Sequence, residues 1–176
     1  MQALTAGKRS DVLYDMLSRT DSPSYGYQLQ RRATSLTEAW DTNPHSSQNH
    51  FMLGHAEEWF YRGLAGIDFD MSRPANERIV VRPFLPRGVA SAKAGYDSVL
   101  GTIVSSWRRE AGSVSLDVSV PAGATAKVYL PTNNPASLNE GGNPLEKATG
   151  VRRLNAGSGT VGCEISSGHY HFQWRE

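Results

Sequence analysis

The residues of this chain with the clearest chemical potential lie in a short stretch around Glu38. Glu38 supplies a carboxylate, and the indole of Trp40 follows two residues later. Three hydroxyl side chains precede the carboxylate: Thr34, Ser35 and Thr37. An aromatic ring can stack on the apolar face of a sugar, while carboxylate and hydroxyl groups can bond to its hydroxyls. The stretch is therefore typical of a carbohydrate site, although a surface loop with a solvated Glu is the more common setting for such a carboxylate.

The histidines of the chain do not have the spacing of a metal site. His45, His50 and His55 are five residues apart, which places neighbours on different faces of a helix, whereas a zinc-binding pair is four apart with a Glu between. His169 and His171 share one face of an extended strand, where we expect a structural or solvated role. The sequence also has no Gly-x-Ser-x-Gly nucleophile motif and no glycine-rich phosphate loop. We therefore expect neither a metal nor another cofactor.

Cleavage of a glycosidic bond needs two carboxyl groups, one as general acid and one as base or nucleophile. Glu38 is one candidate, and the others within the chain are Asp41, Glu57 and Glu58. None of these three stands in the apolar sequence context that would raise the pKa of a carboxyl to that of an acid. On the residues alone, the catalytic pair is incomplete.

The composition narrows the class of protein. The chain has 176 residues and a formal net charge of +1, which allows one ordinary domain, or one domain with part of another, and favours neither nucleic acid nor a membrane as partner. Cys163 is the single cysteine, so we expect it to pack in a core without a disulfide. No apolar run is long enough for a bilayer, and the first eight residues lack a signal-peptide core. We expect a soluble chain of undefined compartment, cut from a longer protein.

The first 70 residues have a helical pattern. Ser10 is an N-cap candidate, and apolar residues at helical spacing follow it until Pro23 ends the helix. Ser46 or Ser47 is expected to cap a second helix, which runs to about Leu64. The polar loop between these helices then holds the candidate site.

From residue 71 onward the pattern changes to short strands and turns. The clearest alternation of apolar and polar residues covers 113–120. The segments 159–165 and 168–174 flank a Ser-Ser-Gly turn and predict a final hairpin. Helices first and strands second, without alternation, predict an α+β protein. We expect a helical part over residues 1–70 and an antiparallel β-sandwich over residues 71–176.

Short segments spread over about residues 10 to 131 carry a family resemblance. In the helical part they are Pro23-Ser24-Tyr25-Gly26-Tyr27, Ala33 to Asp41, Ser46 to Gly54 and Glu58 to Ile67. In the strand part they are Arg82-Pro83, Tyr96-Asp97-Ser98, Gly101 to Trp107 and Val128 to Pro131. In this order and spacing, the segments resemble bacterial α-L-rhamnosidases of glycoside hydrolase family 78.

The resemblance implies a fold and a site. The catalytic domain of this family is an (α/α)6 barrel followed by a C-terminal β-sandwich, so residues 1–70 would be the terminal helices and active-site loop of an incomplete barrel. It also implies that Glu38 is the general base of an inverting reaction, that Trp40 walls the sugar pocket and that His50 contacts the sugar.

The same resemblance implies partners. The family's general acid lies on an earlier part of the barrel, outside this chain, so the N-terminal part of the same protein would be a partner and the fragment alone would be inactive. The substrate would be a rhamnose-containing glycan or glycoside.

Two positions depart from the family pattern. An aromatic residue usually precedes the base and Arg follows it, where this chain has Thr37 and Ala39. These replacements bear on which sugar fits and on the surroundings of the base. The alternative is a non-catalytic β-sandwich scaffold or carbohydrate-binding module. Its sheet would contact glycan through aromatic residues: Tyr96, Trp107 or Tyr129.

Overall fold

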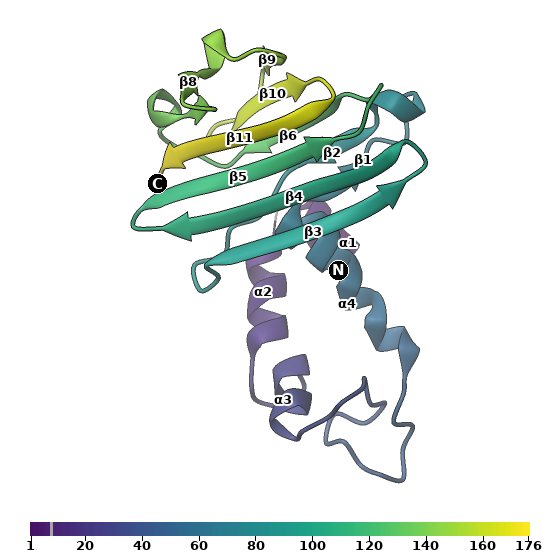
Figure 1. Ribbon diagram of the computed structural model, residues 1–176. Helices are drawn as coiled ribbons and strands as arrows, with labels where there is room; N and C mark the ends of the chain where they lie inside the picture. The colour runs from purple at the N-terminus through teal and green to yellow at the C-terminus, as the bar shows by residue number, and fades with distance from the viewer. Residues whose placement is uncertain (8) are drawn as a thin grey trace. The chain divides into compact units, whose positions relative to one another are not determined.

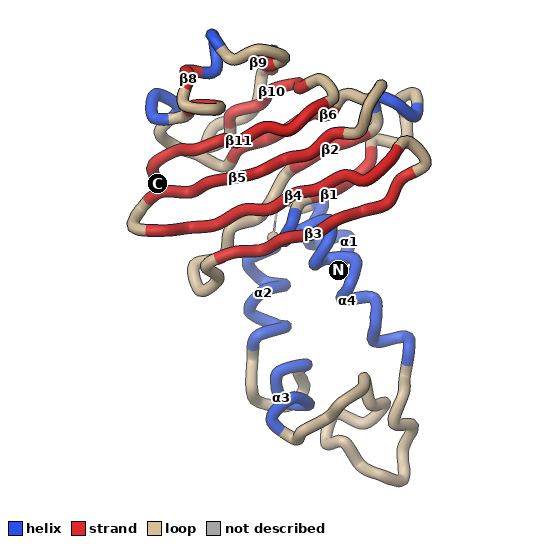
Figure 2. The backbone as a smooth tube through the Cα atoms, viewed as in Figure 1, coloured by secondary structure: helices blue, strands red, loops and turns tan. Residues whose placement is uncertain are grey.

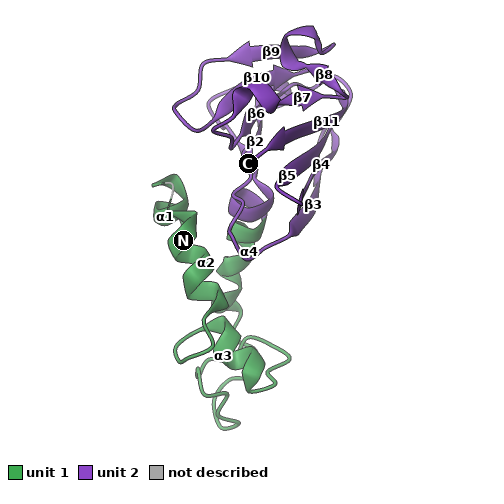
Figure 3. Ribbon diagram, turned by 90° about the vertical axis from the view of Figure 1, so that its left-hand side faces the viewer, with its two compact units in different colours: residues 1–60 green, residues 61–176 purple. Residues whose placement is uncertain are grey.

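The structure, a computed structural model, describes residues 1–7 and 9–176. It divides the chain into two compact units, Met1–Phe60 and Tyr61–Glu176, drawn in green and purple in Figure 3. Unit 1 is made of helices and a long loop, whereas unit 2 is made mainly of strands. The predicted α+β class, with helices before strands, is confirmed.

Unit 1 consists of short helices (Figures 1 and 2). They are α1 (Gln2–Ala6), α2 (Ser10–Ser18), α3 (Tyr25–Gln30), the 3-10 helix η1 (Phe51–His55), α4 (Ala56–Trp59) and the π-helix η2 (Phe60–Ala65), through which the chain passes into unit 2. Ser10 begins α2, but it does not act as the predicted cap, because Arg9 holds the N-cap position without a side-chain bond. The Ser10 hydroxyl instead accepts a hydrogen bond from Nε1 of Trp59 at 3.3 Å and so links α2 to α4.

Ser24 and Gly26 allow the start of α3 to lie close to the Arg19 carbonyl at the end of α2. The buried Ser24 hydroxyl accepts from the Tyr27 N–H at 3.0 Å, which caps α3, and donates to the Arg19 carbonyl at 2.6 Å. A Cβ at Gly26 would lie 2.2 Å from that same carbonyl oxygen, so a larger residue would push the helices apart. The connection therefore fixes α3, which supports the candidate site.

The second predicted helix begins later than expected. Residues 46–50 are not helical, and the helical segment starts with η1 at Phe51 and continues as α4 and η2. The physical reason is that the backbone of this stretch bonds elsewhere. The Ser47 carbonyl accepts from the Glu38 N–H at 2.9 Å, and the His50 N–H donates to the Leu36 carbonyl at 2.6 Å. Those groups cannot also form the first turn of a helix.

Unit 2 contains two sheets, with strand orders β1-β2-β6-β10-β9 and β3-β4-β5-β11-β7-β8. The first sheet comprises β1 (Ile67–Phe69), β2 (Ile79–Val81), β6 (Ala126–Leu130), β10 (Val161–Ile165) and β9 (Val151–Leu154). The second comprises β3 (Ser91–Ser98), β4 (Gly101–Glu110), β5 (Ser113–Val120), β11 (Gly168–Arg175), β7 (Asn139–Glu140) and β8 (Asn143–Pro144). The connections include the 3-10 helices η3 (Ala75–Glu77), η4 (Pro135–Ser137) and η5 (Leu145–Lys147).

The core of unit 2 lies between the two sheets. In β5, the residues of the predicted apolar row are buried: Val114, Leu116, Val118 and Val120. The first three of them pair with the inward-facing aromatic residues of β11, which are Trp174, Phe172 and Tyr170 respectively. The alternation in the sequence therefore identifies the buried face correctly, because successive strand residues point to opposite sides.

Two details of the predicted sandwich are wrong. The sheet that contains β2 and β6 is mixed rather than purely antiparallel, since these two strands pair in parallel. The predicted final hairpin does not form either, because β10 pairs with β6 and β9 whereas β11 pairs with β5 and β7. The short Ser-Ser segment crosses from one sheet to the other. The crossing lets the apolar rows of β10 and β11 line the core from opposite layers.

Candidate functional site

The stretch around Glu38 lies in the loop between α3 and η1, where two backbone segments run beside each other. The segment 35–38 is bonded to the segment 47–50 by main-chain groups and by the Ser35 hydroxyl, which donates to the Gln48 carbonyl. Within the second segment, the Gln48 amide donates to the carbonyls of Asn43 (2.8 Å) and Ser46 (2.9 Å). The loop is therefore held by its own polar groups, and the hydroxyl of Ser35 serves the backbone rather than Glu38.

Glu38 itself combines a fixed backbone with an exposed carboxylate. Its N–H donates to the Ser47 carbonyl at 2.9 Å, and its Oε2 lies 3.4 Å from the Ser47 N–H. The side chain is exposed to solvent. An exposed carboxylate of this kind can accept hydrogen bonds from water or from a ligand.

Thr37 directly precedes Glu38 in the chain and is only 2% exposed. Its Oγ1 donates to the Ala39 carbonyl at 2.8 Å. Nε2 of Gln28, on α3, donates to both the carbonyl and the Oγ1 of Thr37, each at 2.9 Å. The Thr37 hydroxyl therefore does not donate to Glu38, since its proton goes to the Ala39 carbonyl.

Trp40 is held from the side by Tyr25. The two rings meet edge to face, with centroids 5.7 Å apart and planes at 86°. The Tyr25 hydroxyl donates to the Leu53 carbonyl in η1 at 2.6 Å, and burial raises the pKa of Tyr25 above its ordinary value. Tyr25 thus connects α3, Trp40 and η1, and Trp40 is partly buried. A ring fixed in this way can present one face to a ligand without losing much side-chain entropy.

His50 lies at the N-terminal end of η1, and its side chain is half-buried. Its N–H bonds to the Leu36 carbonyl, two residues before Glu38. The structure therefore brings the backbones of Glu38 and His50 into one small region. His45 lies on the exposed part of the loop, where its N–H donates to Oδ1 of Asn43 at 2.9 Å.

The other candidate carboxylates, Asp41, Glu57 and Glu58, also lie in unit 1. Asp41 is exposed, and its Oδ1 accepts from the Asn43 N–H at 3.1 Å, as in an Asx turn. Glu57 is exposed as well, and Glu58 accepts from the Gln2 amide at 3.0 Å. A general acid needs an apolar or like-charged setting that favours the protonated form. Asp41 and Glu57 are exposed to solvent, which is not such a setting.

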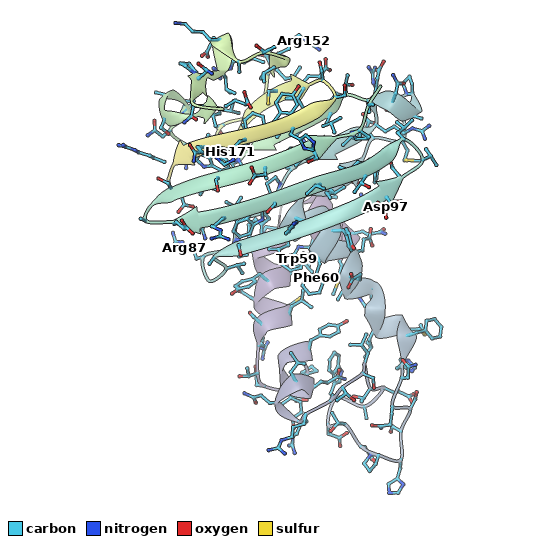
Figure 4. The ribbon with its side chains drawn as sticks, viewed as in Figure 1. Trp59, Phe60, Arg87, Asp97, Arg152 and His171 are labelled. Carbon is cyan, nitrogen blue, oxygen red and sulfur yellow. The ribbon has the colours of Figure 1, made fainter. Side chains whose placement is uncertain are left out.

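Among residues 1–7 and 9–176, no group of three or more His, Cys, Asp or Glu is arranged to hold a metal ion. On the outer face of the second sheet, His171 lies beside Asp117 with Nδ1 and Oδ1 2.6 Å apart (Figure 4), and His169 bonds to Ser119 at 2.7 Å. Both histidines are therefore paired within the sheet. In the same part of the chain, no helix has the length and apolar character needed to cross a membrane.

The aromatic residues considered for glycan binding by the sheets differ in their access. Trp107 is 1% exposed, and its Nε1 donates to the Leu64 carbonyl at 2.8 Å, so it belongs to the core and cannot stack on a sugar. The Arg82 guanidinium lies over the Tyr129 ring at 4.0 Å and covers it. Tyr96 is 43% exposed and touches Phe69, with ring centroids 5.1 Å apart. Tyr96 is the accessible member of the three.

Two supporting residues were missed at the level of sequence. Tyr25 belongs to the aromatic-glycine-aromatic segment that carries part of the resemblance, so its presence near the site had a signal. Gln28 had none, because a single amide in a short helix does not reveal which loop it will meet. Both reach the Glu38 loop because α3 places them three residues apart, on one side of the helix.

Comparisons with known proteins identify the family to which the chain belongs. The sequence model of the bacterial alpha-L-rhamnosidase 6 hairpin glycosidase domain matches residues 1–64, and that of the bacterial alpha-L-rhamnosidase C-terminal domain matches residues 66–144. The α-L-rhamnosidase of Streptomyces avermitilis is 30% identical over 181 residues, which cover 98% of this chain and 17% of that protein.

Solved structures give the same result. The structure of an α-L-rhamnosidase from Dictyoglumus thermophilum superimposes with a TM-score of 0.85 at 26% identity, over 99% of this chain and 20% of that one. The Streptomyces avermitilis enzyme complexed with L-rhamnose gives 0.83 at 29% identity, over 98% of this chain and 17% of that one. The chain thus spans about a fifth of the length of these relatives. It belongs to the bacterial α-L-rhamnosidase family, of which it carries sequence of the six-hairpin glycosidase domain and of the C-terminal domain.

Proposed function

We propose that this chain contributes the general base, Glu38, to an inverting glycoside hydrolase that acts on α-L-rhamnosides. The observation that carries the proposal is the state of Glu38, whose backbone is fixed by Ser47 while its carboxylate stays exposed. Family membership supports the reaction class, and a relative solved with L-rhamnose supports the sugar.

In the proposed reaction, the Glu38 carboxylate takes a proton from a water molecule as the water attacks the anomeric carbon. A general acid on another part of the protein gives a proton to the departing oxygen. The two carboxyl groups of an inverting site stand about 6.5–9.5 Å apart, which leaves room for the water. Asp41 and Glu57 are exposed, and the resemblance to the family implies an acid on an earlier part of the barrel, so we place the acid outside this chain.

Trp40 and His50 have binding roles in this proposal. The Trp40 ring, held edge to face by Tyr25, forms a wall against which the apolar face of the sugar lies. The backbone of His50 bonds to the segment that precedes Glu38, and in this proposal its imidazole bonds to a sugar hydroxyl. Both residues position the anomeric carbon relative to the base, and such positioning can account for several kcal/mol of the barrier.

We further propose that the helices of unit 1 belong to an (α/α)6 barrel completed by the N-terminal part of the same protein. Large apolar side chains of unit 1 are exposed: Met16, Leu29, Phe51, Met52 and Phe60. Exposed apolar residues in this number are typical of surfaces that pack against further protein. Helices as short as α3 and η1 also depend on such packing for their stability.

The experiment uses the full-length protein that carries this chain, together with the chain alone. With a 4-nitrophenyl α-L-rhamnoside, proton NMR of the first turnovers should show the β-anomer of L-rhamnose, as inversion requires. The chain alone should release no 4-nitrophenol above the spontaneous rate. Release of the α-anomer first would contradict inversion, and turnover by the chain alone would contradict an acid outside it.

A second candidate, a glycan-binding sandwich, is favoured by one observation: the exposed ring of Tyr96 beside Phe69. Calorimetric titration of the chain with L-rhamnose separates it from a scaffold. Heat that disappears in Tyr96→Ala supports binding by the sheet, while the absence of heat at millimolar sugar excludes it.

A further inference from the structure

Two buried polar side chains bond to each other directly before the candidate base in the chain. Gln28 and Thr37 are each 2% exposed, although polar side chains are mostly found at the surface. They meet across nine residues of sequence, with Gln28 on α3 and Thr37 in the loop. Burial of such groups is unfavourable unless their hydrogen bonds are made, so the presence of this buried polar pair requires an explanation.

The bonds of this pair run in a definite direction. Gln28 Nε2 donates to the carbonyl and to the hydroxyl of Thr37, and the Thr37 hydroxyl donates onward to the Ala39 carbonyl. The residues fixed in this way stand immediately before and immediately after Glu38. The Ser47 contacts fix Glu38 itself. Three consecutive residues are therefore held, and the base is the central one.

The buried pair of Gln28 and Thr37 is not the most stable arrangement that this position allows. Oε1 of Gln28 is buried and has no hydrogen-bond partner among the described residues. An unsatisfied buried acceptor destabilises a fold, whereas two apolar side chains of similar shape can replace a buried polar pair without loss. The amide orientation that leaves Oε1 unpartnered is the one that lets Nε2 reach Thr37.

We propose that Gln28 and Thr37 are positioning residues for Glu38, a role that rests on the proposed function. The family pattern has an aromatic residue where this chain has Thr37, so the clamp formed by Gln28, Thr37 and Ala39 is a property of this chain. It sets the direction in which the Glu38 carboxylate points toward the attacking water. Displacement of a reacting group by about 1 Å can slow a reaction about 100-fold.

The test measures kcat, KM and the pH–rate profile in the full-length protein. Thr37→Val removes the hydroxyl but keeps shape, and should lower kcat about 10- to 100-fold with KM within about threefold. It should also shift the acidic limb of the profile, which reports the base. Thr37→Ser, which keeps the hydroxyl, should restore kcat to within about threefold. Thr20→Val, at an exposed position of unit 1, is the matched control and should leave all three unchanged.

Gln28→Met provides the second variant, because it conserves volume and removes the donor. Its effect on kcat should match that of Thr37→Val, and the double variant should be no slower than either alone, since both break one clamp. If Glu38→Gln is inactive while Thr37→Val and Gln28→Met keep kcat within twofold, the positioning role is overturned and the proposed function stands. If Glu38→Gln keeps normal turnover, the proposed function fails, and the positioning role fails with it.

Discussion

Arg109 should contribute much more to the stability of unit 2 than its neighbour Arg108. The Arg109 guanidinium donates to three main-chain carbonyls of the segment before β3, at Leu85 (3.2 Å), Pro86 (2.9 Å) and Val89 (3.2 Å). It also donates twice to Oε1 of Glu176, at 2.9 and 2.8 Å. One planar side chain thus ties β4 to the segment 85–89 and to the end of the chain.

The expected magnitude follows from the exposure of these groups. The Arg109 side chain is 22% exposed, so its carbonyl partners are partly shielded from water. Net contributions of about 0.5–1.5 kcal/mol per hydrogen bond give about 1.5–4.5 kcal/mol for the three carbonyls. Glu176 is 41% exposed, and a surface ion pair adds less than about 1 kcal/mol. Arg109→Met, which keeps most of the apolar stem, should therefore destabilise unit 2 by about 3 kcal/mol.

Thermal unfolding followed by near-ultraviolet circular dichroism measures this effect. About 3 kcal/mol corresponds to a fall in Tm of roughly 10 °C for a unit of this size. Arg108→Met is the matched control, because Arg108 and its partner Glu110 are 67% and 69% exposed, and it should change Tm by less than about 2 °C. Glu176→Gln isolates the ion pair and should fall between the two. Equal Tm values for Arg109→Met and Arg108→Met would refute the reasoning.

Two further predictions concern buried positions of unit 2. Gly66 has φ of +83°, and a Cβ there would lie 2.2 Å from the Pro83 nitrogen, so Gly66→Ala should lower the free energy of unfolding in urea by more than about 3 kcal/mol. Gly123 has φ of +78° but open space around it, so Gly123→Ala should cost only about 1 kcal/mol. Equal losses in the two variants would contradict this. Burial raises the pKa of the Cys163 thiol from 9.0 to about 12, so iodoacetamide at pH 8 should alkylate it only in urea, as read by mass spectrometry. Between about pH 9 and 12 the unfolded thiol ionises first, so the free energy of unfolding should fall with rising pH, and a rise would contradict the assigned cause.

The sequence predicts the parts of the fold that local patterns determine. The row of apolar residues in β5 is visible as alternation, and the order of helices and strands follows from composition. The local patterns do not predict the sheet to which each strand belongs. A Ser-Ser-Gly segment between two strands fits a hairpin, yet here it leads from β10 in one sheet to β11 in the other. That outcome depends on long-range pairing with β6 and β5, which no local pattern contains.

In the candidate site, too, local patterns predict some features and miss those that depend on long-range contacts. Glu38, Trp40 and His50 stand out by residue type and by resemblance to a family, and the loop that holds Glu38 and Trp40 was predicted as a loop. The start of the second helix was misplaced because residues 46–50 bond to the Glu38 segment. The contact from Gln28 could not be predicted, since it joins a short helix to a loop through side chains alone.

The central claim is that Glu38 is a general base, and the turnover of Glu38→Gln in the full-length protein tests it most directly. General base catalysis contributes about 10²- to 10⁴-fold, so kcat on an α-L-rhamnoside should fall by that factor with little change in KM. Asp41→Asn, a matched change at a neighbouring exposed carboxylate, should keep kcat within about threefold. Near-normal turnover by Glu38→Gln, or an equal loss in Asp41→Asn, would contradict the assignment.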